Sequence, residues 1–130
     1  MLTITMTFTG VLLLMQVGLS ATTSSYRARL GIDYGDNGNQ VMLKAIRAHG
    51  NFIEYVPIVL IALGSSEVAG APPWLLITCG CALVLSRLSH AAHMLGFGGQ
   101  PTRLFGAGLT TVVMTVLGLY LLGRTSGVLA

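Results

Sequence analysis

The sequence has very few charged residues: seven Lys or Arg and four Asp or Glu make up only 8% of its 130 residues. An ordinary soluble domain carries about 25% charged residues, so this chain could not cover the surface of a soluble globule. It also lacks a basic run, which argues against a nucleic-acid-binding protein despite the net charge of +3. Two cysteines are too few for a disulfide scaffold. Because 53% of the residues are hydrophobic, an integral membrane protein is the class that remains.

Four stretches are apolar and long enough to cross a bilayer, for which a helix needs about 20 residues. They are residues 4–25, 41–66, 73–95 and 103–124. The first carries no charge and no basic segment precedes it, so we expect a retained span and not a cleaved signal peptide. Because the connections are short, the sequence predicts one all-α domain over residues 1–130, an up-down four-helix bundle in the membrane.

Lys and Arg are distributed unequally between the two ends of this predicted bundle. The first and third loops, with the adjoining helix ends, contain Arg27, Arg29, Lys44 and Arg103, whereas the opposite end contains only Arg124. The positive-inside rule therefore predicts that the first and third loops are cytoplasmic.

The second predicted span contains ionisable groups at membrane depth, which are costly and usually line an interior or a site. Arg47, Asn51, Glu54 and Tyr55 are spaced i, i+4, i+7 and i+8, which places them within about 100° of one helix face. Charges of both signs on one face suit a zwitterionic ligand. An internal ion pair is the alternative, and the spacing favours neither. We also expect Arg47 to be buried, with Asn51 and Tyr55 as its polar neighbours.

His49 lies about 200° around the helix from Arg47, so it cannot easily share that face. It either faces a neighbouring subunit or is a satisfied core histidine near the membrane surface. On the third span, Arg87 and His90 share a face at i and i+3. His90 and His93 lack the Glu-x-x-His carboxylates of a di-metal bundle, so the sequence predicts no metal site.

The basic residues of the predicted cytoplasmic end suggest more than a topology signal. This group contains Arg27, Arg29, Lys44, Arg47, Arg87 and Arg103. Arg47 and Arg87 lie inside their helices, where topology does not require them. We therefore expect an anion site at this end of the bundle.

Residues 47–57, Arg-Ala-His-Gly-Asn-Phe-Ile-Glu-Tyr-Val-Pro, closely resemble the signature of the MAPEG family, the membrane-associated proteins in eicosanoid and glutathione metabolism. That signature has Arg, a small residue, Gln or His, then Asn, Glu, Tyr and Pro at these spacings. The Gly-rich first loop is similar to the bacterial branch, and the likeness to microsomal glutathione transferases extends over nearly the whole chain.

The resemblance implies a homotrimer in a bacterial inner membrane, with glutathione bound as co-substrate between neighbouring subunits. It implies transfer of glutathione to lipophilic electrophiles, or reduction of peroxides by it. Carried over by position, the implied glutathione ligands are Arg27, Arg47, His49, Asn51, Glu54, Tyr55, Arg87 and His90. Arg103 is the implied thiol activator, and His49 would reach the ligand of a neighbouring subunit. His90 and Met94 stand where many members have tyrosines.

Two other functions stay open at this point. One is a non-catalytic lipid-binding or scaffold protein with the same fold, although a scaffold has no need of a thiol activator such as Arg103. The other is a small ion-coupled transporter with Glu54 as its proton site. Arg47 on the same face argues against it, because a nearby cation keeps a carboxylate ionised.

Overall fold

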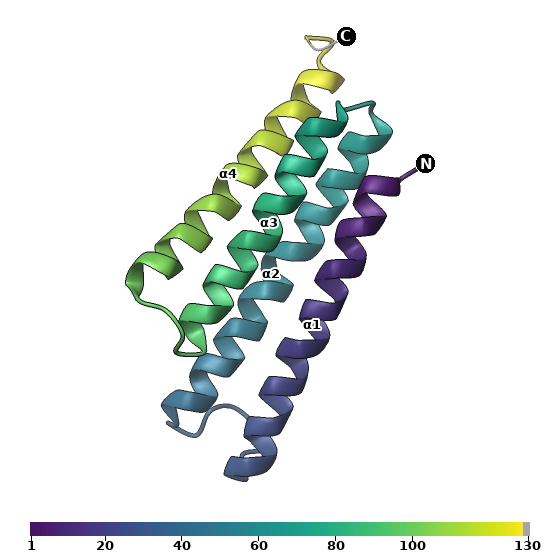
Figure 1. Cartoon of the computed structure of the whole chain (residues 1–130). Helices are drawn as coiled ribbons and strands as arrows, with labels where there is room; N and C mark the ends of the chain where they lie inside the picture. The colour runs from purple at the N-terminus through teal and green to yellow at the C-terminus, as the bar shows by residue number, and fades with distance from the viewer. Residues whose placement is uncertain (129–130) are drawn as a thin grey trace.

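The computed structural model of the chain describes residues 1–128, and this range contains four α-helices. They are α1 (Thr3–Leu30), α2 (Gln40–Val68), α3 (Pro73–Met94) and α4 (Gln100–Thr125). Each is long and apolar enough to cross a membrane, and each contains one of the four predicted spans or most of it. Figure 1 shows that the α1–α2 and α3–α4 loops lie at one end of the bundle, while both termini lie at the other.

The local sequence explains where the helices begin and end. Gly31 ends α1 in the left-handed region at φ 63°, a conformation that glycine adopts without a steric cost. Asn39 caps α2, because its side-chain oxygen accepts hydrogen bonds from the backbone N–H groups of Val41 and Met42. Pro73 is the first residue of α3, where a missing N–H costs nothing. The polar residues after position 25 therefore still belong to α1, which is longer than the predicted apolar run.

The core lies where the apolar faces of the helices meet. Leu12, Leu63, Leu83 and Leu117, one from each helix, are almost completely buried. On α2 the buried positions recur every three or four residues, as a single inward face requires. Large apolar side chains also stay exposed on all four helices, which is the surface that lipid solvates in a membrane protein.

Two contacts fix how pairs of helices approach one another: a close backbone contact at Gly106 and the hydrogen bonds of Glu67. Gly106 allows α4 to lie against the backbone of α3, since a Cβ at this position would be 2.8 Å from the carbonyl oxygen of Ser86. At the end of the bundle where the chain begins, the Glu67 carboxylate accepts from the backbone N–H groups of Ile4 and Thr5, at 3.0 and 2.8 Å. The Thr5 hydroxyl donates to it as well, at 2.6 Å. Glu67 at the end of α2 thereby caps the start of α1.

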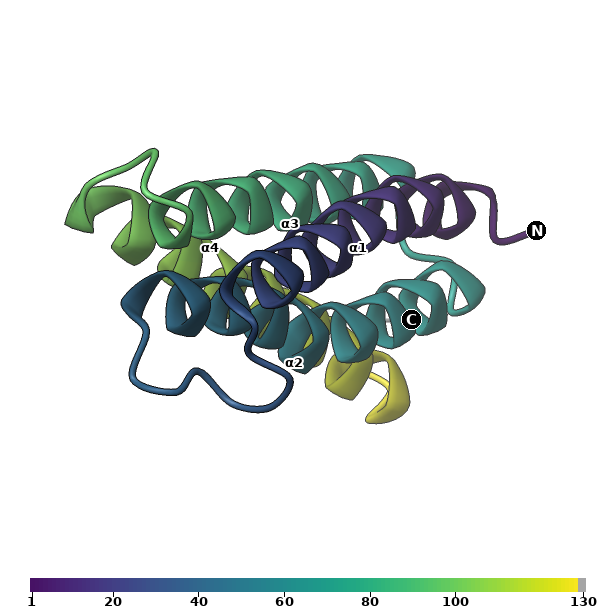
Figure 2. The same cartoon turned by 90° about the horizontal axis from the view of Figure 1, so that it is seen from below.

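Viewed from the loop end, the first residues of α4 lie beside the end of α3, and the start of α2 is drawn below them (Figure 2). Arg47, Arg87 and Arg103 lie in the parts of α2, α3 and α4 towards this end, where the sequence predicts an anion site.

Candidate functional site

Arg87 is the centre of a buried polar group that joins α2, α3 and α4. Only 3% of Arg87 is exposed. Its Nη1 donates to the side-chain oxygen of Asn51 at 2.5 Å and to the Asn51 carbonyl oxygen at 3.3 Å. Its Nη2 donates to the hydroxyl of Thr110, and its Nε donates to the hydroxyl of Ser86 at 3.2 Å. The guanidinium also lies 5.5 Å from the centre of the Tyr55 ring. We call these five residues the Arg87 cluster.

The spacing of small and polar residues explains how the Arg87 cluster forms. Asn51 and Tyr55 are one helical turn apart on α2, so both face Arg87. Thr110 follows Gly106 by one turn of α4, at the point where Gly106 brings α4 against α3. The Thr110 hydroxyl lies 3.0 Å from the Ser86 hydroxyl and 2.8 Å from the Gly106 carbonyl oxygen, to either of which it can donate.

The acceptors around Arg87 are all neutral. In the part of the chain that the structure describes, its hydrogen bonds go to one amide oxygen, one carbonyl oxygen and two hydroxyls. The ring of Tyr55 adds an attraction between cation and π-face. The Arg87 guanidinium is therefore held in place by neutral groups, and no carboxylate among the described residues pairs with it.

His90 is a buried residue of α3 at the end of the bundle that carries the predicted basic residues. It is 6% exposed and lies one turn after Arg87 on α3. Arg87, Arg103 and Arg47 are all near enough to act on its ring electrostatically. The structure thus brings predicted ligands from α2 and α3 and the predicted thiol activator from α4 to one end of the bundle.

The outward side of this region carries both signs of charge. The side chains of Arg47, Glu54 and Arg103 are exposed, and Tyr55 is 36% exposed. Among the described residues, Arg47 and Glu54 form no ion pair with each other or with another group. Both charges therefore face outward, as a site for a zwitterionic ligand requires, and the internal pair is not formed.

The expectation that Arg47 is buried beside Asn51 and Tyr55 is wrong. Arg87 of α3 takes both of these neighbours, because α3 packs along that side of α2. Arg47 lies one turn nearer the start of α2 and extends away from the core.

Arg27 does not join the Arg87 cluster within one chain. Its Nη1 donates to the carbonyl oxygens of Ile32, Asp33 and Gly35, at 3.2, 3.1 and 3.1 Å. Arg27 therefore holds the first loop against the end of α1, a local role that the sequence did not indicate.

His49 lies on the side of α2 that faces α1. Its Nε2 is 2.8 Å from the Nε2 of Gln16, so the glutamine amide donates to the ring nitrogen. Gln16 of the same chain therefore partners His49, whose side chain is half-buried. Within one chain, His49 thus corresponds to the second alternative, a histidine whose ring is hydrogen-bonded inside the bundle.

Residues 1–128 bring together no group of three or more His, Cys, Asp or Glu side chains that could hold a metal ion. His93 is used by the third loop, since its Nδ1 lies 3.1 and 2.8 Å from the carbonyl oxygens of Gly98 and Gly99. Carbonyl oxygens only accept, so this nitrogen carries a proton and cannot bind a metal.

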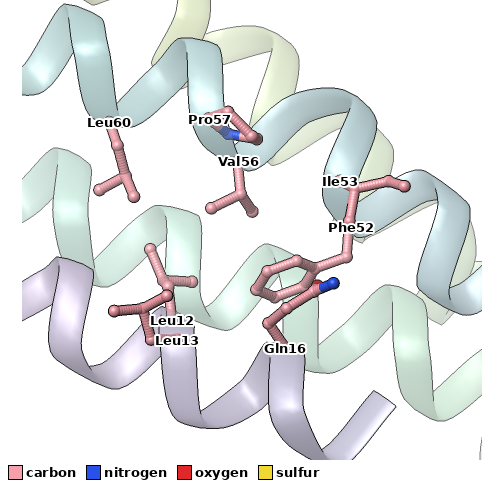
Figure 3. Close-up of a pocket in the computed structure, with 8 residues that line it drawn as sticks. All are labelled: Leu12, Leu13, Gln16, Phe52, Ile53, Val56, Pro57 and Leu60. Carbon is pink, nitrogen blue, oxygen red and sulfur yellow. The ribbon is translucent and has the colours of Figure 1, made fainter. Parts of the chain in front are cut away.

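Two cavities border these residues. The smaller has a volume of about 70 Å³ and lies at the Arg87 cluster, where Asn51, Tyr55, Arg87 and Thr110 line it together with Ala107 and Thr111. The larger, of about 260 Å³, lies between α1 and α2, and its eight lining residues are apolar except for Gln16 (Figure 3).

Sequence reasoning missed Ser86, Thr110 and Gln16. Ser86 stands directly before Arg87, but neighbours in a helix point in different directions, so adjacency gave no reason to select it. Thr110 lies in an apolar run, and threonines there commonly bond to their own helix, as Thr111 and Thr115 do. Only the packing of α3 on α4 distinguishes Thr110 from these.

Comparison with known proteins agrees with this architecture. The sequence profile of the MAPEG family matches residues 5–123. The chain is 39% identical over 64 residues to the inner membrane protein YecN from each of two Escherichia coli strains. That segment is 49% of this chain and 49% of YecN, so the match spans about half the length of these curated relatives. No solved structure matches the chain.

Proposed function

Because the chain belongs to the MAPEG family, we propose that it binds glutathione in the membrane and uses it, as a transferase or peroxidase, on lipophilic electrophiles. The observation that carries this proposal is the buried guanidinium of Arg87, which Asn51 and Thr110 hold beside the ring of Tyr55. Arg47 near the start of α2 and Arg103 near the start of α4 are exposed at the same end of the bundle, and Glu54 is exposed two turns after Arg47, which supports the proposal. The names of the relatives state only a membrane location, so the activity is our proposal for this chain.

The charges at this end complement those of glutathione, which carries two carboxylates and one ammonium near neutral pH. Arginines bind carboxylates through forked, charge-assisted hydrogen bonds. Glu54 can accept from the ammonium, since no cation among the described residues pairs with it. A mixed-charge peptide therefore fits this face better than a simple anion or cation does.

Arg103 supplies the chemical step in this proposal. The thiolate of glutathione is the nucleophile, and a neighbouring arginine lowers the pKa of a thiol by stabilising the charged form. Arg103 is exposed in the first turn of α4, at the same end of the bundle as Arg47. The electrophile reaches the thiolate from the bilayer, in which lipophilic molecules concentrate.

We further propose a homotrimer in the bacterial inner membrane, with the first and third loops in the cytoplasm and glutathione shared between neighbouring subunits. Arg27 and His49 lie away from the Arg87 cluster within one chain. A ligand held between two chains would meet them from one subunit and Arg47, Asn51 and Glu54 from the next.

A glutathione titration by calorimetry, on purified protein in lipid nanodiscs, tests the proposal. Glu54→Gln should weaken binding about 10- to 100-fold, the loss of one charge-assisted hydrogen bond. Asp33→Asn is the control, because it removes one carboxylate from an exposed position in the first loop. Absence of binding to the wild type refutes the proposal. Equal affinities of a folded Glu54→Gln variant and the wild type remove Glu54 from the site.

A non-catalytic lipid-binding protein is the second candidate function, and His90 and Met94 favour it. Neither side chain offers the phenol that many MAPEG proteins have at these positions. Thiolate formation on bound glutathione distinguishes the candidates, since a lipid-binding protein has no reason to activate a thiol.

A further inference from the structure

We infer that a third cavity, at the loop end of the bundle, binds the phosphate group of an anionic phospholipid. The cavity has a volume of about 120 Å³ and lies between the ends of three helices. It is lined by Tyr26, Val41, Lys44, Met94, Leu95 and Gly96. None of these is an implied glutathione ligand, and the inference does not depend on the proposed function.

The cavity lies at the depth of lipid headgroups. Tyr26 is in the last two turns of α1, Lys44 is in the first two turns of α2, and Met94 is the last residue of α3. The headgroup layer on each side of the hydrocarbon core is about 5–7 Å thick, which is about one helical turn. Tyrosine is also enriched at this level. The phosphates of the leaflet on this side therefore lie level with the cavity.

Lys44 brings to the cavity a positive charge that no described residue neutralises. Its side chain is exposed and forms no hydrogen bond or ion pair within residues 1–128. Arg29 is exposed and unpaired in the same range, and it follows Tyr26 by three residues, so it lies on the same side of α1. The carboxylates of the first loop, Asp33 and Asp36, do not line the cavity. Unpaired cations at the membrane surface attract anionic headgroups.

Tyr26 adds a hydrogen-bond donor with a fixed position. It is half-buried, and its ring packs against the small apolar cluster of Ile32, Met42 and Ala45. Its hydroxyl has no partner among the described residues. Phosphate oxygens accept from hydroxyl and ammonium groups alike, and hydrogen bonds to an ionised acceptor are the stronger ones. Lys44 would therefore supply the charge and Tyr26 the orientation of a bound phosphate.

The size and surroundings of the cavity favour a lipid over a free phosphate ion. A volume of about 120 Å³ corresponds to about four water molecules, at about 30 Å³ each. It holds one phosphate group but no acyl chain. Val41, Met94 and Leu95 form an apolar side of the cavity, and Val41 is half exposed. A lipid can place its phosphate beside Lys44 and its apolar part along these side chains, whereas a free ion makes only the first contact.

A lysine beside the end of α3 has an alternative role, because a cation stabilises the negative end of a helix dipole. Lys44 forms no hydrogen bond to the carbonyl oxygens there. The two roles also differ in what they depend on. A helix-capping cation stabilises the protein in any lipid, whereas a headgroup site stabilises it only when anionic lipid is bound.

Thermal unfolding in a neutral detergent without glutathione, followed by circular dichroism, tests the inference. The protein is titrated at constant ionic strength with phosphatidylglycerol, with phosphatidylcholine of the same acyl chains, or with inorganic phosphate. We expect a saturable rise in Tm with phosphatidylglycerol, as binding to the native state requires, and no such rise with the other two at the same concentrations.

Variants assign this response to the cavity. Lys44→Gln and Tyr26→Phe should each raise the half-saturating concentration of phosphatidylglycerol about tenfold, through the loss of one charge-assisted hydrogen bond. Lys44→Arg keeps the charge and should titrate close to the wild type. Arg124→Gln removes a cation from the opposite end of the bundle and should also respond like the wild type, which controls for general attraction between cations and an anionic micelle.

Equal responses of the wild type to the two lipids overturn the inference, and so does a Lys44→Gln variant that titrates like Arg124→Gln. A Lys44→Gln variant whose Tm falls by the same amount in both lipids assigns Lys44 to the end of α3 and overturns it as well. A response to inorganic phosphate that equals the response to phosphatidylglycerol identifies a free ion as the ligand, against the lipid. Because glutathione is absent from these titrations, the headgroup site and the proposed function can fail separately.

Discussion

Replacing Gly106 by alanine should force α3 and α4 apart. The added Cβ would be 2.8 Å from the Ser86 carbonyl oxygen, 3.1 Å from the His90 backbone nitrogen and 3.2 Å from the His90 Cβ. Two of these three atoms belong to the backbone of a packed helix, so no side-chain rotation relieves the contact. The helices must separate by several tenths of an ångström, and Thr110, one turn away, then withdraws from Arg87.

The expected destabilisation is about 1–3 kcal/mol, the usual cost of inserting a methyl group into a well-packed contact. Gly108→Ala provides the matched control. It lies on the same helix two residues away, and an added Cβ there meets nothing within 4 Å. Both substitutions carry the same gain of about 1 kcal/mol in helix propensity, so the difference between the two variants isolates the contact with α3.

Equilibrium unfolding in mixed micelles, followed by circular dichroism, measures that difference. We expect Gly106→Ala to unfold at a lower denaturing-detergent fraction than Gly108→Ala by an amount that corresponds to about 1–3 kcal/mol. Equal stability of the two variants would show that α3 and α4 are not in contact at Gly106. The geometry of the Arg87 cluster, which depends on that contact, would then be wrong as well.

Three further predictions concern the thiol, the start of α1 and the assembly. Arg103→Leu should leave glutathione binding largely intact while the pKa of the bound thiol rises towards about 8.5, which thiolate absorbance against pH detects. Identical titrations of variant and wild type would remove Arg103 as activator. Glu67→Gln should lower stability by about 1 kcal/mol, because it removes the negative charge that accepts the N–H groups of Ile4 and Thr5, and an unchanged unfolding midpoint would contradict this. The protein's mass in detergent should correspond to three chains, so a stable monomer would refute the trimer.

The four membrane helices could be predicted from the sequence because their signal is local. Uninterrupted apolar runs, the polar first loop and Pro72-Pro73 fix the number and order of the spans. The helix ends were harder to predict: α1 continues to Leu30 because serine and tyrosine do not break a helix. Gly31, and not the loss of hydrophobicity, ends it.

For the candidate site, too, the features within one helix were predictable and the contacts between helices were not. The polar face of α2 was visible as a helical spacing, and the structure shows Asn51 and Tyr55 facing Arg87 together. The partner itself could not be identified, because it depends on how α3 packs on α2. Arg47 was the cation on the same helix, and periodicity alone gave no means of choosing Arg87 over it.

His49, on the other side of α2, also shows that a helical angle can be predicted but a packing partner cannot. Its angle of about 200° from Arg47 correctly separates it from the polar face. Whether a second chain or α1 covers that angle is a question of tertiary packing, and Gln16 of α1 answers it for the single chain.

The Glu67 link also limits how α1 can move against α2. Three hydrogen bonds fasten α1 to α2 at the end far from the basic residues. Towards the other end the Gln16 amide bonds to His49, and the Thr23 hydroxyl donates to the Ala45 carbonyl oxygen at 3.4 Å. The two helices are therefore fastened along their length, by a carboxylate at one end and by neutral side chains towards the other. Any separation of α1 from α2 must break hydrogen bonds, and at the end where the chain begins these bonds carry a charge.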